Sequence, residues 1–210
     1  GQAADASPTD VSAAIAAARR AFDQGDWPQQ HAQRHAVITK LRDLLFANSD
    51  KLVDIARLEA GAAIGAAGRA HVNGALSGMD DLLKCFHDVT WEEDRGRRNE
   101  YGFDSDRTVV HEPLGVVGAI TPWNVPLYVN VGKVIAALLS GCTVVLKPAP
   151  DTPLMGAIMG ELAAEAGFPA GVFNVVTSSD PAMAGEMLVA DPRVDVISFT
   201  GSTAIGKRIM

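Results

Sequence analysis

The stretch 115–148 most constrains the fold, because it holds two short apolar segments separated by a helical pattern. Residues 115–121 carry small and β-branched apolar side chains that favour a buried strand, and Pro122 ends it. Pro126 suits the first turn of a helix whose apolar positions recur at helical spacing. Residues 143–147 form the second apolar segment. A strand, a crossover helix and another strand make a βαβ unit, whose two strands are parallel.

The same alternation continues beyond this unit. Two more apolar segments, 172–176 and 194–199, are predicted strands, and Pro181 opens a short helix between them. Strands that alternate with helices form a parallel sheet covered by helices on both faces. The predicted fold class is therefore α/β.

The start of the chain is helical in pattern and offers two candidate capping residues. Thr9 or Asp10 can cap the first helix, and residues 1–8 are expected to be frayed. Similarly, Asp151 or Thr152 can cap the helix that follows the second strand of the βαβ unit.

Composition restricts the kind of protein. The chain has 210 residues, of which 48% are hydrophobic and 20% charged, so it can bury a sizeable core. Its formal net charge is −7 and no basic stripe is present, which argues against nucleic acid or an anionic membrane as a partner. No apolar run approaches the length of a membrane span. Two cysteines predict no disulfide framework, which fits a reducing, cytoplasmic location.

Two histidines, His31 and His35, share one face of a predicted helix. A zinc protease motif would place Glu directly after the first histidine, but Ala32 stands there. We therefore expect a solvated helix face and predict no metal site.

Polar side chains follow two strands of the βαβ unit at their carboxyl ends, where open α/β sheets bind ligands. Trp123 and Asn124 follow the first strand, and Lys147 ends the second. A lysine there can reach a sugar hydroxyl or a phosphate, and an asparagine amide can donate to a developing oxyanion. Taken singly, the lysine is equally consistent with an ordinary surface residue, and the asparagine with an ordinary turn residue.

A glycine-containing loop follows the fourth predicted strand. Thr200, Gly201 and Ser202 precede the last helix, and free backbone amides there form an anion site. Residues 201–207 also match most of the phosphate-loop motif of NTPases. That motif fails at Arg208, where a hydroxyl side chain is required for magnesium, so an NTPase is a minor alternative.

Three motifs occur in a family-specific order. P-W-N-x-P spans 122–126, V-V-L-K-P spans 144–148, and F-T-G-S-T-x-x-G spans 199–206. Together they resemble the aldehyde dehydrogenase superfamily, most clearly over 112–210. The resemblance implies a Rossmann-like domain that binds NAD or NADP.

The resemblance also implies a division of the chain. Residues 1–90 correspond to the N-terminal helical part of the cofactor-binding domain. Residues 91–112 correspond to a β-hairpin that helps build the oligomer interface of a homodimer or homotetramer, with its turn expected at 104–106. Residues 113–210 correspond to an incomplete NAD(P)-binding domain, and the catalytic domain lies outside this chain.

Site residues follow from the same resemblance. Asn124 contributes to the oxyanion hole, and Lys133 lies near the active site with a role in proton relay. Lys147 contacts the adenosine ribose, and Ser202 contacts the pyrophosphate. The remaining cofactor-binding positions are Ile120, Thr121, Pro122, Trp123, Pro150, Gly201 and Gly206.

In the family, a cysteine thiolate attacks a small-molecule aldehyde, a hydride passes to the nicotinamide, and a glutamate activates the water that hydrolyses the thioester. Both residues lie beyond Met210 in family order, and neither Cys85 nor Cys142 matches the nucleophile. The chain by itself is therefore expected to be inactive. A non-catalytic nucleotide-binding domain is the main alternative.

One position departs from the family pattern. Many members carry glutamate three residues after the lysine, where it binds the ribose hydroxyls, and this chain has Pro150. Proline cannot repel a 2′-phosphate, which leaves room for NADP. No arginine is placed to hold that phosphate, so NAD is slightly preferred.

Overall fold

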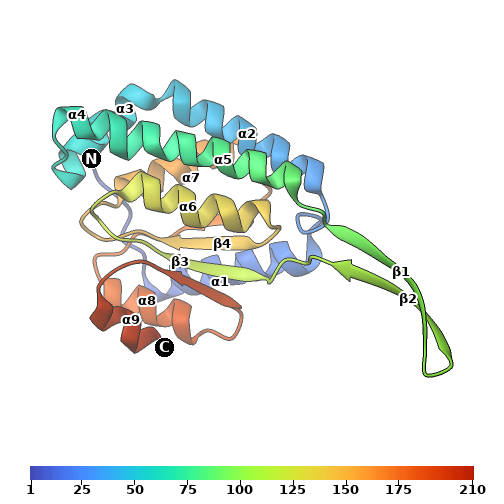
Figure 1. The fold of residues 1–210 in the computed structure, drawn as a ribbon. Helices are drawn as coiled ribbons and strands as arrows, with labels where there is room; N and C mark the ends of the chain where they lie inside the picture. The colour runs from blue at the N-terminus through green and yellow to red at the C-terminus, as the bar shows by residue number, and fades with distance from the viewer.

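The computed structural model describes residues 1–210, and it is built around a four-stranded sheet of order β5-β4-β3-β6. All three pairings in this sheet are parallel. Helices cover both faces, and a two-stranded arm extends away from the body (Figure 1). The α/β prediction, with a parallel sheet between helical layers, is confirmed.

The strands occupy the predicted segments, three of them in shortened form. They are β3 (Val116–Ile120), β4 (Thr143–Lys147), β5 (Phe173–Val175) and β6 (Val196–Phe199). The last two start late because turns precede them. The Val172 amide donates to Pro169, and the Val194 amide donates to Asp191.

Alternate residues of the strands face two separate cores, as the period of a β-strand requires. Val117 and Ala119 join the larger core, and Val116 and Ile120 join the smaller one. The larger core lies under α2 (His31–Ala47), α3 (Ser49–Ala60), α5 (Gly74–Asp88), α6 (Pro126–Leu139) and α7 (Leu154–Ala166). The smaller core lies between the sheet, α1 (Pro8–Gln24) and α8 (Pro181–Ala190). The remaining helices are α4 (Ile64–Ala66), the π-helix η1 (Ala67–Asn73) and α9 (Thr203–Ile209).

The first residues are held in place, which corrects the prediction of a frayed start. Ala6 donates its amide to Thr177, and Thr177 Oγ1 donates to the Ala4 carbonyl. The cap of α1 is Ser7, two residues before Thr9, the nearer of the two predicted caps. The Ser7 hydroxyl accepts from the Asp10 amide while the Asp10 carboxylate accepts from the Ser7 amide.

The cap of α7 also differs from the prediction. Glu59, at the end of α3, accepts hydrogen bonds from the amides of Leu154 (2.6 Å) and Met155 (3.2 Å). Thr152 Oγ1 is buried and has no hydrogen-bond partner. Burial raises the pKa of the Glu59 carboxyl, although both amide bonds act to lower it.

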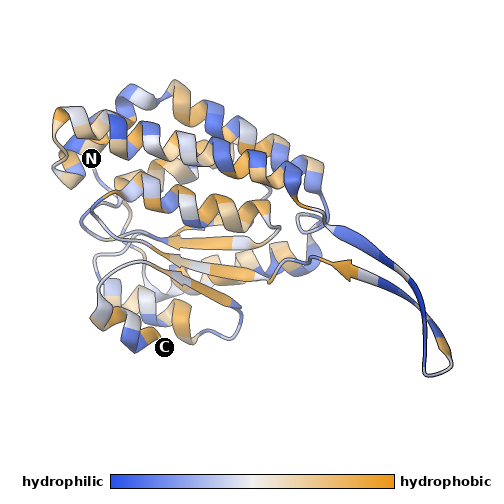
Figure 2. Cartoon of the chain, in the orientation of Figure 1, coloured by the Kyte–Doolittle hydropathy of each residue, from blue (hydrophilic) through white to orange (hydrophobic).

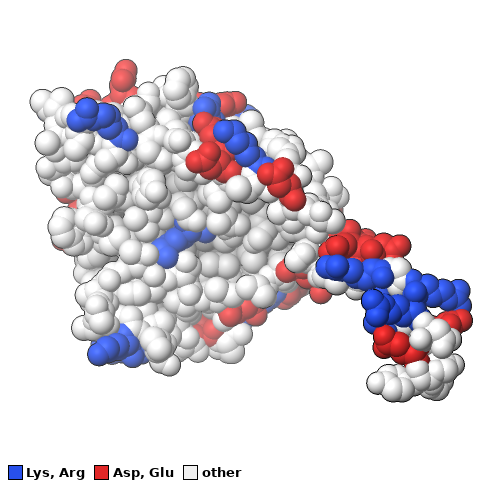
Figure 3. Space-filling view, in the orientation of Figure 1, with Lys and Arg blue, Asp and Glu red and all other residues white.

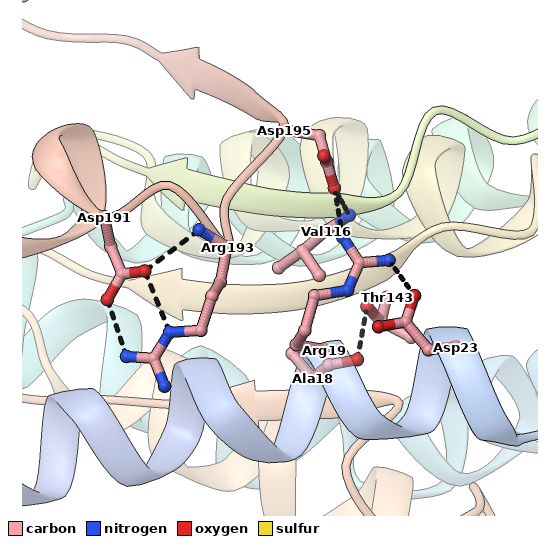
Figure 4. A network of polar contacts seen from close by, with 8 residues as sticks. All are labelled: Ala18, Arg19, Asp23, Val116, Thr143, Asp191, Arg193 and Asp195. Atoms are coloured by element: carbon pink, nitrogen blue, oxygen red, sulfur yellow. Dashed lines mark hydrogen bonds and ion pairs between the residues drawn. The ribbon is translucent and has the colours of Figure 1, made fainter.

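A polar network fixes α1 to the amino end of the sheet (Figure 4). Asp195 Oδ2 accepts from the Val116 amide (2.7 Å) and from Arg19 Nη1 (2.8 Å). Arg19 also bonds Asp23 on its own helix, and Thr143 Oγ1 donates to the Ala18 carbonyl at 3.0 Å. These contacts tie three strands to one helix.

The arm consists of β1 (Glu92–Glu100) and β2 (Phe103–Val110), paired antiparallel. The predicted turn at 104–106 is wrong, since those residues pair within the ladder. Tyr101 and Gly102 form the turn instead, and both have positive φ angles (56° and 81°), as a two-residue hairpin requires. The arm is hydrophilic along most of its length (Figure 2).

Charged side chains gather on the arm and over α2 and α5 on the face shown in Figure 3, and the rest of that face carries few. The predicted solvated face at His31 and His35 is only partly exposed, because both histidines are half-buried against other rings. His31 stacks near Trp91 with ring centroids 4.4 Å apart, and His35 lies 4.5 Å from His87. Burial is the main cause that lowers the pKa of His31 and of His35.

Between these histidines, Arg34 is completely buried. Its guanidinium donates to the carbonyls of Leu139, Trp27 and Pro28 at 2.6–3.0 Å, and no carboxylate pairs with it. Burial lowers the pKa of Arg34 to about 10. The residue satisfies a carbonyl in the last turn of α6 and thereby joins α2 to α6.

None of the helices combines the length and the hydrophobicity that a membrane-spanning helix needs.

Candidate functional site

The carboxyl ends of three strands meet at one edge of the sheet. Ile120 is in register with Lys147 on β4 and with Phe199 on β6. The Thr121 amide donates to the Lys147 carbonyl (3.2 Å), and the Thr200 amide donates to the Ile120 carbonyl (3.0 Å). The segments that carry Trp123, Lys147 and Ser202 therefore leave the sheet at the same edge, as predicted.

Lys147 is a buried cation at this edge, with 4% of its surface exposed. Its ammonium has one partner, the Pro148 carbonyl at 3.3 Å, and no carboxylate. Burial lowers the pKa of Lys147. A desolvated ammonium with unused donors suits a hydroxyl or phosphate oxygen of a ligand.

The residues in the segment after β3 differ from one another in how far they are exposed. Thr121 is buried and its Oγ1 has no partner, whereas Trp123 is 55% exposed. Pro122 is half-buried, and Asn124 is exposed with no side-chain bond. The Asn124 amide is thus free to donate outward from the loop that leads into α6. Pro150 is also exposed, three residues after Lys147.

The glycine loop follows β6 directly. Ser202 caps α9, because its hydroxyl accepts from the Ile205 amide at 3.3 Å. A Cβ on Gly201 would lie 2.5 Å from the Phe199 ring, so this position requires glycine. A Cβ on Gly206 would meet the same ring at ordinary contact distance.

The phosphate-loop alternative does not fit this geometry. Residues 203–207 belong to α9, and Lys207 lies exposed in its last turn. A phosphate loop instead wraps its ligand with loop backbone and places its lysine at the start of the helix. The Ser202 cap begins the helix too early for such a loop.

Lys133 extends from α6 toward the sheet. Its Nζ donates to Ser198 Oγ on β6 at 3.0 Å, and burial lowers the pKa of Lys133. Sequence reasoning missed Ser198. The alternation of β6 contained the signal, because Val196 and Ser198 fall on one face of that strand.

Both cysteines lie away from this edge. Cys142 is buried just before β4, at the opposite end of that strand from Lys147, and Cys85 is exposed on α5. No group of three or more His, Cys, Asp or Glu side chains is placed to hold a metal ion.

The aldehyde dehydrogenase family model matches residues 1–210. The putative aldehyde dehydrogenase DhaS of Bacillus subtilis is 39% identical over 207 residues, which cover 98% of this chain and 41% of that protein.

Solved structures agree in fold and sequence. An NAD-dependent aldehyde dehydrogenase from Sinorhizobium meliloti is 42% identical, with a TM-score of 0.88 over 98% of this chain and 40% of the other. A Mycobacterium tuberculosis aldehyde dehydrogenase complexed with NAD+ is 39% identical, with a TM-score of 0.90 over 99% and 42%. The chain thus spans about two fifths of the length of these proteins. On its sequence and its fold alike, the chain belongs to the aldehyde dehydrogenase family.

Proposed function

We propose that the protein takes part in NAD(P)-dependent oxidation of an aldehyde to a carboxylic acid, and that this chain supplies the cofactor-binding part. The observation that carries the proposal is the meeting of Thr121, Lys147 and Thr200 at one strand edge, in a chain of this family.

The residues at this edge fit a dinucleotide. Lys147 offers buried donors without an anionic partner, which suits a ribose hydroxyl. Gly201 is exposed and stands next to Ser202 at the start of α9, where backbone amides suit a pyrophosphate oxygen. Backbone at Ile120–Trp123 and residues Pro150 and Gly206 complete the proposed surface. The bound nicotinamide would supply the hydride acceptor.

The catalytic roles proposed for this chain fall on two residues. The exposed Asn124 amide donates to the oxyanion that forms when a cysteine thiolate adds to the aldehyde carbonyl. Lys133, on the helix that follows Asn124, takes part in proton relay. The thiohemiacetal and the later thioester require a cysteine and a general base that this chain does not provide at the edge. We therefore expect no aldehyde oxidation by the 210-residue chain alone.

The arm has a proposed role in assembly. β1 and β2 stand away from the body with mostly exposed residues, including Phe103 and Val110. A second copy of the protein would cover this surface in a homodimer or homotetramer, as the family resemblance implies.

NADH fluorescence titration of the 210-residue chain tests cofactor binding. Lys147→Ala should weaken NADH binding about tenfold or more, since it removes a charged donor from a desolvated site. Lys84→Ala, an exposed lysine on α5, is the matched control and should leave the affinity unchanged. Equal affinity in the Lys147 and Lys84 variants would contradict the proposed site.

The oxyanion role is tested in the complete enzyme. Asn124→Ala should lower kcat by roughly a hundredfold, the usual effect of losing one oxyanion donor, with little change in NADH affinity. Full turnover of this variant would rule out the role.

A further inference from the structure

The hydrogen bond between Lys133 and Ser198 joins two segments of the candidate site. Lys133 stands in the third turn of α6, the helix that follows Asn124. Ser198 is the third residue of β6, and two positions later the chain reaches Thr200 and the glycine loop. The 3.0 Å bond between Nζ and Oγ is the direct polar link between these two segments.

The surroundings of this bond are apolar. Ser198 is in register with Ala119 on β3, and Val196 on the same face packs against the larger core. Burial is the one cause that lowers the pKa of Lys133, and neither a carboxylate nor a second cation contributes. The Ser198 hydroxyl is therefore the single side-chain acceptor that Lys133 has.

A lysine side chain needs such an acceptor to hold one position. Its four-carbon stem is flexible, so an ammonium without an acceptor has no fixed position in these apolar surroundings. The hydroxyl of Ser198 opposes this, because it accepts from the charged form at a place where solvation is reduced.

We propose that Ser198 is a positioning residue for Lys133, and that its hydroxyl fixes the ammonium between the loop of Asn124 and the loop of Gly201. The claim that this position serves aldehyde oxidation rests on the proposed function. The placement of the ammonium by Ser198 does not depend on that function.

The proposal makes a specific prediction for the protonation of Lys133. A hydrogen bond to the charged form favours it, so loss of the hydroxyl leaves a half-buried ammonium without an acceptor. The pKa of Lys133 should then fall further below its ordinary value. A side chain of the same shape without a hydroxyl should have the same effect as alanine.

The test measures the pH dependence of acetylation at Lys133 in the folded 210-residue chain, by peptide mass spectrometry. Ser198→Ala and Ser198→Val should lower the titration midpoint by about one pH unit relative to Ser198→Thr, which keeps the hydroxyl. Ser105→Ala on the arm is the matched control and should leave the midpoint unchanged. Thr and Val have nearly equal shape, so the comparison of these two variants isolates the effect of the hydroxyl even if the alanine variant does not fold. An equal midpoint in the Thr and Val variants would overturn the proposal.

NADH titration of the same variants separates this proposal from the proposed function. If the titration midpoint is lower in the variants that lack the hydroxyl but the wild-type chain does not bind NADH, Ser198 positions Lys133 and the proposed function fails. If the chain binds NADH but the titration midpoint is the same with and without the hydroxyl, the proposed function stands and the role of Ser198 is refuted.

Discussion

Asp195 occupies the space that any side chain at Gly115 would fill. A Cβ on Gly115 would lie 1.9 Å from Asp195 Oδ2, the oxygen that also accepts from the Val116 amide and from Arg19. Gly115 has a φ angle of +131°, which L side chains rarely adopt. The start of β3 and the attachment of α1 thus depend on the absence of a side chain at Gly115.

Gly115→Ala should destabilise the protein by about 2–4 kcal/mol, since it combines backbone strain with the loss of the Asp195 bonds. Gly78→Ala is the control, because Gly78 lies inside α5 with open space around it, and alanine there should stabilise by about 0.5–1 kcal/mol. Urea unfolding gives both free energies. A smaller loss for Gly115→Ala than about 1 kcal/mol would contradict the conflict with Asp195.

Arg34→Met should lower the free energy of unfolding by about 3 kcal/mol or more. The variant leaves the buried carbonyls of Leu139, Trp27 and Pro28 without their donor. Arg34→Lys should recover only part of the loss, because an ammonium cannot reproduce the fork of donors. Arg20→Met, at an exposed position on α1, should change stability by no more than about 0.5 kcal/mol in the same urea titration.

Stability should decrease as pH falls from 8 to 5.5. Burial lowers the pKa values of His31, His35 and His71 below the ordinary 6.5, so the unfolded chain binds protons first as pH falls through that value. Glu59 acts in the opposite direction, since its raised carboxyl pKa makes folding more favourable toward low pH.

The carboxylates with lowered pKa values, among them Asp191, lose their contribution only below this range, near their ordinary 3.8. His35→Gln should therefore reduce the loss of unfolding free energy between pH 8 and 5.5, while His111→Gln serves as an exposed control. An equal pH dependence in both variants would show that His35 does not contribute.

Pro150→Glu should weaken NADPH binding about tenfold more than NADH binding, provided that the proposed cofactor site is correct. A carboxylate three residues after Lys147 would repel a 2′-phosphate but could accept from ribose hydroxyls. Pro150→Gln controls for the loss of proline. Fluorescence titrations with both nucleotides measure the difference, and equal effects on the two would refute this view of Pro150.

Local sequence signals correctly predicted those elements that have a stop signal at each end. β4 occupies 143–147 as predicted, because Gly141 and Pro148 stop any extension of the strand. The hairpin turn was misplaced because the cross-strand pairing of Asn99 with Asp104 decides the register, and Asp-Ser-Asp is only a weak turn signal beside Tyr101-Gly102.

Sequence patterns could not predict contacts between residues that are far apart in the chain. The cap of α7 comes from Glu59, 95 positions before Leu154, and Arg34 donates to carbonyls on two separate segments, the Trp27–Pro28 turn and the end of α6. For the candidate site, the predicted parallel direction of the strands and the position of the motifs at their carboxyl ends predicted which edge gathers Trp123 and Lys147. They did not show Lys133 bonded to Ser198, because that pairing depends on how α6 crosses the sheet.

The early position of α1 in the chain has a consequence for folding during synthesis. Its apolar face, with Val11 and Ile15, packs against strands and a helix that come more than a hundred residues later. At about 5–20 residues per second, a ribosome would need roughly 10–30 s to supply these partners. Until then the nascent helix exposes its apolar face, so α1 reaches its native contacts long after it is synthesised, and chaperones can bind it in the interval.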